Sequence, residues 1–172
     1  LITNKNLNKL NILCIIPIAG ESIIIDKSYL LEKCIKNTKL SKYIKHIFVA
    51  TDNKNTSEIA RKNKVDSSFL RPKNLSEHFI DESEILDFVI SKFEKKKKFF
   101  DIIVCIKETY PFRDYKLIDK MLETYVKKKS DTIIAIKKEQ RNIWIKEKEN
   151  KTYKFKGLKP RDLKQNEVLI SL

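Results

Sequence analysis

Short, wholly apolar runs recur along the chain and alternate with segments of helical periodicity. The run Ile12–Ile18 lacks the in-and-out pattern of a half-exposed strand, so it predicts a strand that is buried on both faces. Further strands are predicted at Lys45–Thr51, Val65–Leu70, Asp101–Ile106 and Thr132–Ile136. Runs of this length match the usual length of strands and are too short for most helices.

Between these runs, apolar residues recur at the spacing of one helix face. Side chains that can accept a hydrogen bond from a first-turn N–H precede two of the segments. The predicted helices are Leu30–Leu40, Thr56–Lys64 with Thr56 as its N-cap, Ile85–Phe93, and Leu117–Tyr125 with Asp114 as its N-cap.

Strands that alternate with helices indicate βαβ units, and hence a mainly parallel sheet with helices on both faces. The fold class is therefore α/β, a Rossmann-like three-layer sandwich, and we expect residues 1–172 to form a single domain. Beyond Ile136, the residues Trp144, Tyr153 and Phe155 and the stretch Val168–Ile170 indicate a small β-rich extension. In such sheets a ligand binds at the C-terminal ends of the strands, so those loops are the place to look for a site.

The net charge of +14 raises nucleic-acid binding as a hypothesis. The lysines are spread over the whole chain, and the dense run Lys95–Lys98 is typical of the solvated end of a helix. No pattern of stacking aromatic residues accompanies them, so nucleic acid is an unlikely partner. A solvated basic surface is the favoured interpretation.

The three cysteines, Cys14, Cys34 and Cys105, form no CxxC pair, and two of them lie within apolar runs. They predict reduced thiols in a core, with no zinc site. The sequence has no apolar run of about 18 residues and no secretory signal, so we expect a cytoplasmic protein that does not cross a membrane. Since the chain begins with Leu1, a fragment or a trimmed chain is left open.

Four loops follow the predicted strands. Three of them carry the sequences PIAGES, ATDN and LRP, and the fourth is the longer KETYPFRD. A glycine-containing loop before a helix can direct backbone N–H groups at a phosphate, although a plain connecting turn is the commoner structure. Asp52 could hold a metal or a ribose hydroxyl, although by itself the start of a turn is the favoured interpretation. The convergence of Arg71, Lys107 and Arg113 on one sheet edge favours an anionic ligand.

The order of these motifs resembles the acylneuraminate cytidylyltransferases, the family of CMP-sialic acid and CMP-nonulosonate synthetases. That family carries IPARGGSKG, VSTD, RP-x-x-L and QPTSPLR, and the resemblance spans Ile12–Ile136. It implies the nucleotide-diphospho-sugar transferase type of fold, and transfer of CMP from CTP to an acidic nonulosonate sugar with release of pyrophosphate. It also implies Mg²⁺, although no metal ligand can be assigned, and it leaves a homodimer open.

Carried over by position, the resemblance assigns three groups of residues. Lys27 and Arg71 become catalytic residues. Lys107, Thr109 and Arg113 become contacts to the sugar, with Pro111 in the same motif, and Asp52 matches the aspartate of the second strand end. The nucleotide-binding residues become Pro17, Ala19, Gly20, Ser22, Arg71 and Ser83.

Departures from the family pattern are concentrated in the first loop. Ala19 stands where the family has arginine, Glu21 where it has glycine and Ile23 where it has lysine, while Lys107 replaces the glutamine of the fourth loop. The chain also stops before the family's later metal-binding aspartate. A triphosphate site needs cations, so the sequence allows two hypotheses. One is an enzyme with weakened or lost activity, and the other is a degenerate, non-catalytic homologue that serves as a binding or assembly module.

Overall fold

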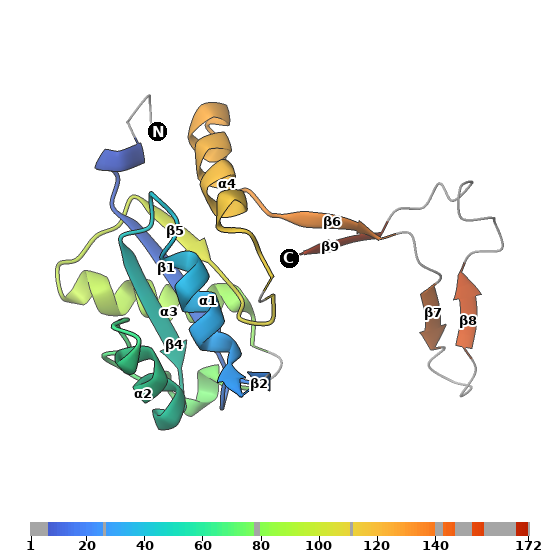
Figure 1. The fold of residues 1–172 in the computed structure, drawn as a ribbon, viewed down its shortest axis with the longest axis horizontal. Helices are drawn as coiled ribbons and strands as arrows, with labels where there is room; N and C mark the ends of the chain where they lie inside the picture. Colours follow the sequence, from blue (N-terminus) through green and yellow to red (C-terminus); the bar gives the residue numbers. More distant parts are fainter. Residues whose placement is uncertain are drawn as a thin grey trace. The chain divides into compact units, whose positions relative to one another are not determined.

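The computed structural model describes residues 7–25, 27–77, 80–110 and 112–139, together with three later strands at 143–146, 153–156 and 168–171. From residue 137 onward only the backbone is described. The chain divides into two compact units, Leu1–Thr132 and Ile133–Leu172, which are treated separately (Figure 1). The expectation of a single domain is not tested by this division and stays a prediction.

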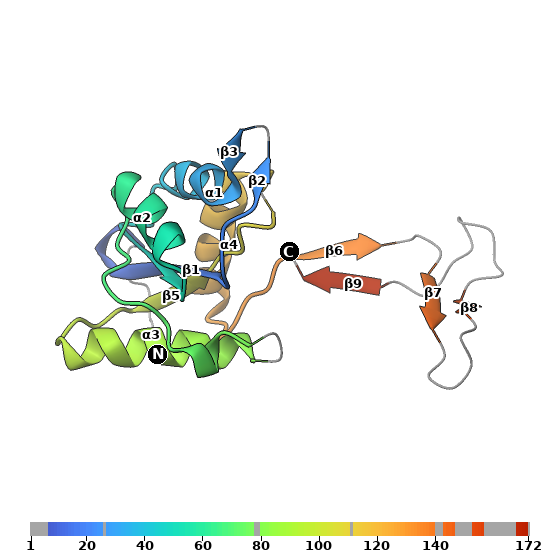
Figure 2. The ribbon, with the colours of Figure 1, turned by 90° about the horizontal axis from the view of Figure 1, so that it is seen from below.

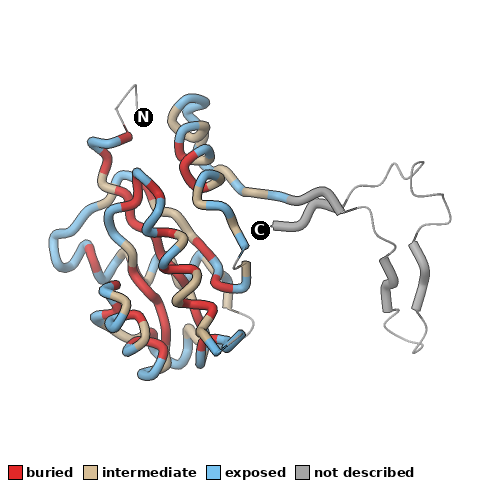
Figure 3. Tube along the Cα trace, in the orientation of Figure 1, coloured by how far each residue is buried: buried red, intermediate tan, exposed pale blue. Residues whose placement is uncertain are grey.

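The first unit is built on a parallel sheet of three strands. They are β1 (Ile12–Ile18), β4 (His46–Thr51) and β5 (Ile102–Cys105), in the order β4-β1-β5. Leu13 of β1 lies opposite His46 of β4, and Ile12 lies opposite Ile102 of β5. The central strand β1 is almost wholly buried, as Figure 3 shows. The prediction that these three runs are strands of one parallel sheet is confirmed.

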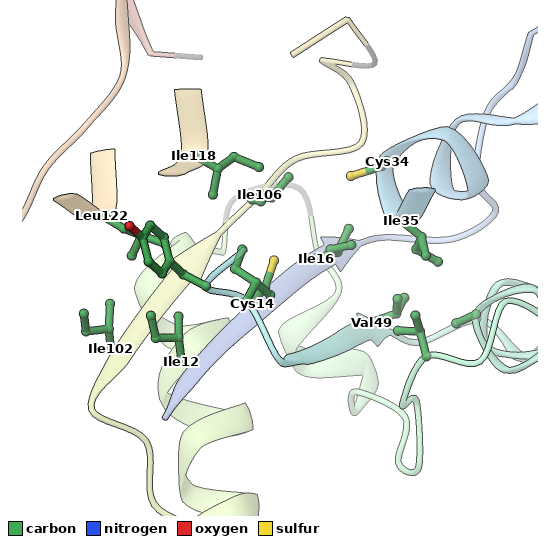
Figure 4. Packing of buried hydrophobic residues seen from close by; sticks show 14 of the residues in the cluster. Ile12, Cys14, Ile16, Cys34, Ile35, Val49, Ile102, Ile106, Ile118 and Leu122 are labelled. Carbon is green, nitrogen blue, oxygen red and sulfur yellow. The ribbon is translucent and has the colours of Figure 1, made fainter. Parts of the chain in front are cut away.

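Alternate side chains of β1 enter two different hydrophobic clusters, one on each face of the sheet. Cys14 and Ile16 pack in a cluster with residues of α1 (Leu30–Thr38) and α4 (Tyr115–Lys128), which Figure 4 shows from close by. Leu13 and Ile15 pack on the opposite face, against α3 (Glu82–Lys95). Figure 2 shows α3 on one side of the sheet and α1 and α4 on the other, which is the predicted three-layer arrangement.

The α3 face of the sheet is dominated by phenylalanine rings. Phe48 of β4 stacks on Phe69 with 4.4 Å between ring centroids and meets Phe93 edge-to-face at 5.3 Å. Phe69 also meets Phe88, and Phe93 meets Phe100. Aromatic pairs of this geometry add to the stabilisation that burial of their area provides. They fix the α3 layer against β4.

Two helix starts test the predicted caps. Asp114 caps α4, because its side chain accepts from the N–H of Lys116, as predicted. The prediction for α2 (Lys54–Lys62) was wrong, since its N-cap is Asn53 and not Thr56. Asn53 accepts from the Thr56 N–H at 3.1 Å, which leaves the Thr56 hydroxyl for the preceding loop. The remaining short elements are η1 (Leu7–Lys9), β2 (Ile24–Ile25), β3 (Ser28–Tyr29) and η2 (Lys73–Leu75).

The prediction of a strand at Val65–Leu70 was also wrong. The segment runs beside β4, but its only β-bridge within the described residues joins Phe48 to Asp66. The Asp66 carboxylate accepts from the Ser68 N–H at 2.9 Å. A local side-chain bond of this kind offers the backbone an alternative to ladder pairing, so the segment follows β4 to Arg71 without forming a strand.

The second unit contains two antiparallel strand pairs. β6 (Ile136–Glu139) pairs with β9 (Val168–Ser171), and β7 (Ile143–Lys146) pairs with β8 (Tyr153–Lys156). The predicted β-rich extension is thus confirmed.

The prediction that Thr132–Ile136 is a strand of the parallel sheet was wrong. Only Ile136 is in a strand, and that strand belongs to a different sheet. Ile134 and Ile136 are 63% and 51% exposed. An apolar run indicates a strand but does not specify its partner, and here the partner is the apolar stretch at Val168–Ser171. None of the helices in the described residues is long and apolar enough to cross a membrane.

Candidate functional site

The loop after β1 turns at Gly20, whose φ of 69° lies in the left-handed region that glycine adopts at least cost. Both backbone polar groups of Gly20 are held from the start of α2. Its N–H donates to Asp52 Oδ1 at 2.8 Å, and its carbonyl accepts from Thr56 Oγ1 at 2.9 Å. The first two strand-end loops are therefore joined by hydrogen bonds between Gly20, Asp52 and Thr56.

Ser22 connects this loop to three other elements. Its N–H donates to Thr56 Oγ1 at 3.3 Å, and its hydroxyl accepts from the Leu31 N–H in the first turn of α1 at 3.1 Å. The same hydroxyl donates to Glu108 Oε2 at 2.6 Å. Ser22 is buried, so these contacts satisfy a polar side chain that water does not reach.

Glu108 is the residue that the sequence analysis missed. Its side chain is buried, with only 6% of the residue exposed. Burial raises the pKa of its carboxyl group, while hydrogen bonds from the Ser22 hydroxyl and the Ile23 backbone N–H act in the opposite direction. The available signal was an acidic residue three positions after the end of β5, where the family motif carries none.

Arg71 lies at the C-terminal ends of β1 and β4. Its Nη2 donates to the Ile18 carbonyl at 2.8 Å, and its backbone N–H donates to the Thr51 carbonyl at 2.8 Å. Only 5% of the residue is exposed, and its Nε is buried without a hydrogen-bond partner among the described residues. Burial lowers the pKa of the guanidinium, and the charge of Asp52 opposes that shift. Arg71 is thus at the same sheet edge as Gly20.

The cations of the loop after β5 lie on the α1 and α3 sides of that edge. Arg113 is half-buried, with its guanidinium 5.7 Å from the centroid of the Tyr110 ring, and its carbonyl accepts from Asn37 Nδ2 in α1. Lys107 is exposed, and its Nζ lies 3.4 Å from Glu82 Oε1 at the start of α3.

The other predicted site residues are more accessible. Ala19, Lys27, Ser83 and Thr109 are exposed, and Pro17 is half-buried. Lys27 has a φ of 62°, in the tight connection between β2 and β3. The Ser83 N–H donates to the Asp81 carboxylate that caps α3. Pro111 lies outside the described residues. The ligand roles assigned to all of these residues stay predictions.

Two N–H donors of the first loop already have acceptors within the protein. The Gly20 N–H donates to Asp52, and the Ser22 N–H donates to Thr56. The Glu21 side chain accepts from Asn55 Nδ2 at 3.1 Å. An incoming anion would therefore meet carboxylates beside the very donors that could bind it, and electrostatic repulsion would weaken its binding.

The sequence matches the cytidylyltransferase family over residues 23–167. It is 23% identical over 131 residues to a pseudaminic acid cytidylyltransferase of Campylobacter jejuni subsp. jejuni serotype O:2. That match covers 72% of this chain and 56% of the relative, so the chain spans little more than half of the relative's length.

Solved structures of low sequence identity share the fold. A 4-diphosphocytidyl-2C-methyl-D-erythritol synthase superposes with a TM-score of 0.60 at 10% identity, covering 95% of this chain and 72% of that one. A CMP:2-keto-3-deoxy-manno-octonic acid synthetase complexed with CTP gives a TM-score of 0.58 at 13% identity, covering 70% and 49% of the two chains. The fold is the Rossmann-like, nucleotide-diphospho-sugar transferase type that the sequence predicted.

Proposed function

The chain belongs to the cytidylyltransferase family, and from that premise we propose that it transfers CMP from CTP to an acidic, sialic-acid-like sugar. In this reaction a sugar hydroxyl oxygen attacks the α-phosphorus of CTP. The bond between that phosphorus and the oxygen that bridges to the β-phosphate breaks, the hydroxyl proton is lost, and pyrophosphate leaves. The relative named for pseudaminic acid supports a nonulosonate substrate through 23% identity.

One observation carries this proposal. The Gly20 loop is hydrogen-bonded to Asp52, and Arg71 lies beside both, at the C-terminal edge of the parallel sheet. That edge is where open α/β sheets bind their ligands. The geometry of these residues supports our proposal that the nucleotide binds at this edge.

The residues divide into a nucleotide side and a sugar side. The first loop and Arg71 would hold the nucleotide, with Lys27 as the exposed cation nearest in sequence to that loop. Lys107 and Arg113, from the loop after β5, would attract the sugar carboxylate, because guanidinium and ammonium groups form strong hydrogen bonds with such anions.

Magnesium, which the resemblance implies, stays a proposal. The described residues contain no group of three or more His, Cys, Asp or Glu side chains that could hold a metal. Mg²⁺ is commonly bound through one or two carboxylates together with substrate phosphates, and Asp52 is the carboxylate at this edge that fits that role. Bound there, the ion would neutralise charge on the phosphates.

A degenerate binding module is the second candidate, and the state of the first loop favours it. The Gly20 and Ser22 N–H donors are occupied by internal acceptors, and Ala19 and Ile23 stand in place of two cations. Each charge-assisted contact that is lost removes roughly 1.5–3 kcal/mol, so the loss of two weakens binding by two or more orders of magnitude. We therefore expect weak CTP binding and slow turnover or none.

The test is pyrophosphate release with CTP, Mg²⁺ and a panel of acidic nonulosonate sugars, alongside a CTP titration with and without Mg²⁺. Arg71→Ala should abolish whatever turnover the wild type has. Arg61→Ala is the matched control. Arg61 lies on α2, and its Nη2 also donates to a backbone carbonyl, that of Ser67, at 2.9 Å. No turnover with any sugar, together with binding of another protein, would favour the module. Fast turnover would refute the expected weakness.

A further inference from the structure

Glu108 places a negative charge in a site that is proposed to bind a triphosphate. A buried carboxylate repels phosphates, so direct contact with the nucleotide does not account for it. Its carboxylate accepts a hydrogen bond from the hydroxyl of Ser22 in the first loop at 2.6 Å. Glu108 itself follows β5, so this contact connects two residues that are 86 positions apart in sequence.

The segment that Glu108 holds is fixed by polar contacts, one of which is the bond from the Leu30 N–H at the start of α1 to the Ile23 carbonyl at 2.7 Å. Ile23, Ile24 and Ile25 are exposed, so the segment buries little of the apolar surface that usually anchors a loop. Its strand β2 pairs only with β3, the next element along the chain. Polar contacts must therefore determine where the segment lies.

Those polar contacts approach Ser22 from three directions. Thr56 at the start of α2 and Leu31 at the start of α1 hold two sides of the residue. The contact from Glu108 is the one that ties it to the end of β5, the strand whose following loop carries Lys107 and Arg113. Without it, the nucleotide and sugar sides of the site would lose a direct link.

We propose that Glu108 is a positioning residue that holds the segment Ser22–Ile25 against the end of β5, so that the first loop and the Lys107–Arg113 loop form one ligand site. As far as ligand binding is concerned, the proposal rests on the proposed function. The positioning itself is a property of the chain without ligand, and can be measured without one.

The experiment compares Glu108→Ala and Glu108→Gln in the full chain. Both variants remove the negative charge, but glutamine keeps an amide oxygen that can accept from the Ser22 hydroxyl. Amide hydrogen exchange across residues 22–25 should accelerate by about tenfold or more in the alanine variant, and by less in the glutamine variant. The CTP dissociation constant should rise in the same order.

The matched control is Asp119→Ala. Ser41 Oγ, in the loop after α1, donates to Asp119 Oδ1 on α4 at 2.6 Å, a buried pair that reproduces the Ser22–Glu108 contact away from the site. This variant should destabilise the fold but leave exchange at 22–25 and CTP affinity unchanged. A loss of CTP affinity equal to that of Glu108→Ala would mean that general destabilisation, and not positioning, explains the result.

Two results would overturn the proposal. One is unchanged exchange at 22–25 in Glu108→Ala, and the other is tighter CTP binding in both Glu108 variants, which would show that the carboxylate only competes with phosphate. If the wild type binds no CTP at all, the proposed function fails. The exchange measurement still decides whether Glu108 positions the segment.

Discussion

Replacing Gly20 with alanine should destabilise the first unit through the backbone alone. The φ of Gly20 is 69°, and a Cβ placed there would have nothing within 4 Å. Steric collision is therefore absent, and the cost comes from the left-handed conformation, which is roughly 1–2 kcal/mol less favourable for an L-residue with a side chain.

The unfolded state offsets part of this cost. Alanine has less backbone freedom than glycine when unfolded, which favours the folded variant by about 0.4–1 kcal/mol. The net loss is therefore about 1 kcal/mol. The backbone cannot relax cheaply, because rotation at Gly20 would break the bonds to Asp52 and Thr56, each worth about 1 kcal/mol.

The assay is urea unfolding followed by far-UV circular dichroism. Gly20→Asn should lose less than Gly20→Ala, because asparagine tolerates the left-handed region better. Lys129→Gly is the control, and it should raise the free energy of unfolding. The exposed Lys129 has a φ of 51° at the C-cap of α4, a conformation that glycine adopts at less cost. An alanine variant as stable as the wild type would refute the reasoning about strain at Gly20.

Three further predictions follow from other parts of the first unit. Asp114→Ala should lower the free energy of unfolding by about 1 kcal/mol in urea titrations, because the Lys116 N–H loses its acceptor; an unchanged midpoint would contradict this. The cysteine thiols should react slowly with a thiol reagent until the chain unfolds. Burial raises the pKa of Cys34, for example, to about 11, and it is the thiolate that reacts. Immediate labelling of every thiol in the native chain would contradict this prediction. Hydrogen bonding from Lys42 lowers the pKa of Glu123, so this carboxylate stabilises the fold above its ordinary pKa and ceases to do so as the pH falls through the lowered value. The free energy of unfolding should therefore fall toward acid pH in the wild type, and this fall should be smaller in Glu123→Gln. Equal pH profiles for the two proteins would count against the contact.

The sequence predicted best where a residue pattern has one physical solution. Seven consecutive residues from Ile12 to Ile18, all apolar in type, can only be accommodated in a strand covered on both faces. The cap at Asp114 was predictable because the residue directly precedes a periodic segment. At α2, by contrast, both Asn53 and Thr56 are good capping residues, and the pattern does not decide between them.

What could not be predicted depends on contacts between distant residues. The Ser22–Glu108 bond forms only once β1 and β5 are neighbours, and no local spacing encodes it. Arg71 was correctly placed at the sheet edge, but its burial against the Ile18 carbonyl follows from the path of the chain beside β4. The partner of β6 was missed because strand pairing is non-local as well.

The division into two units determines which optical probe reports on which part of the chain. Trp144, the one tryptophan in the sequence, lies in β7 of the second unit, whereas every helix in the described residues belongs to the first. Tryptophan emission will therefore follow Ile133–Leu172, while the helical dichroism signal follows Leu1–Thr132. Superimposable denaturation curves from the two probes would mean that the chain unfolds as one cooperative body, and separated curves would mean that each unit has its own stability.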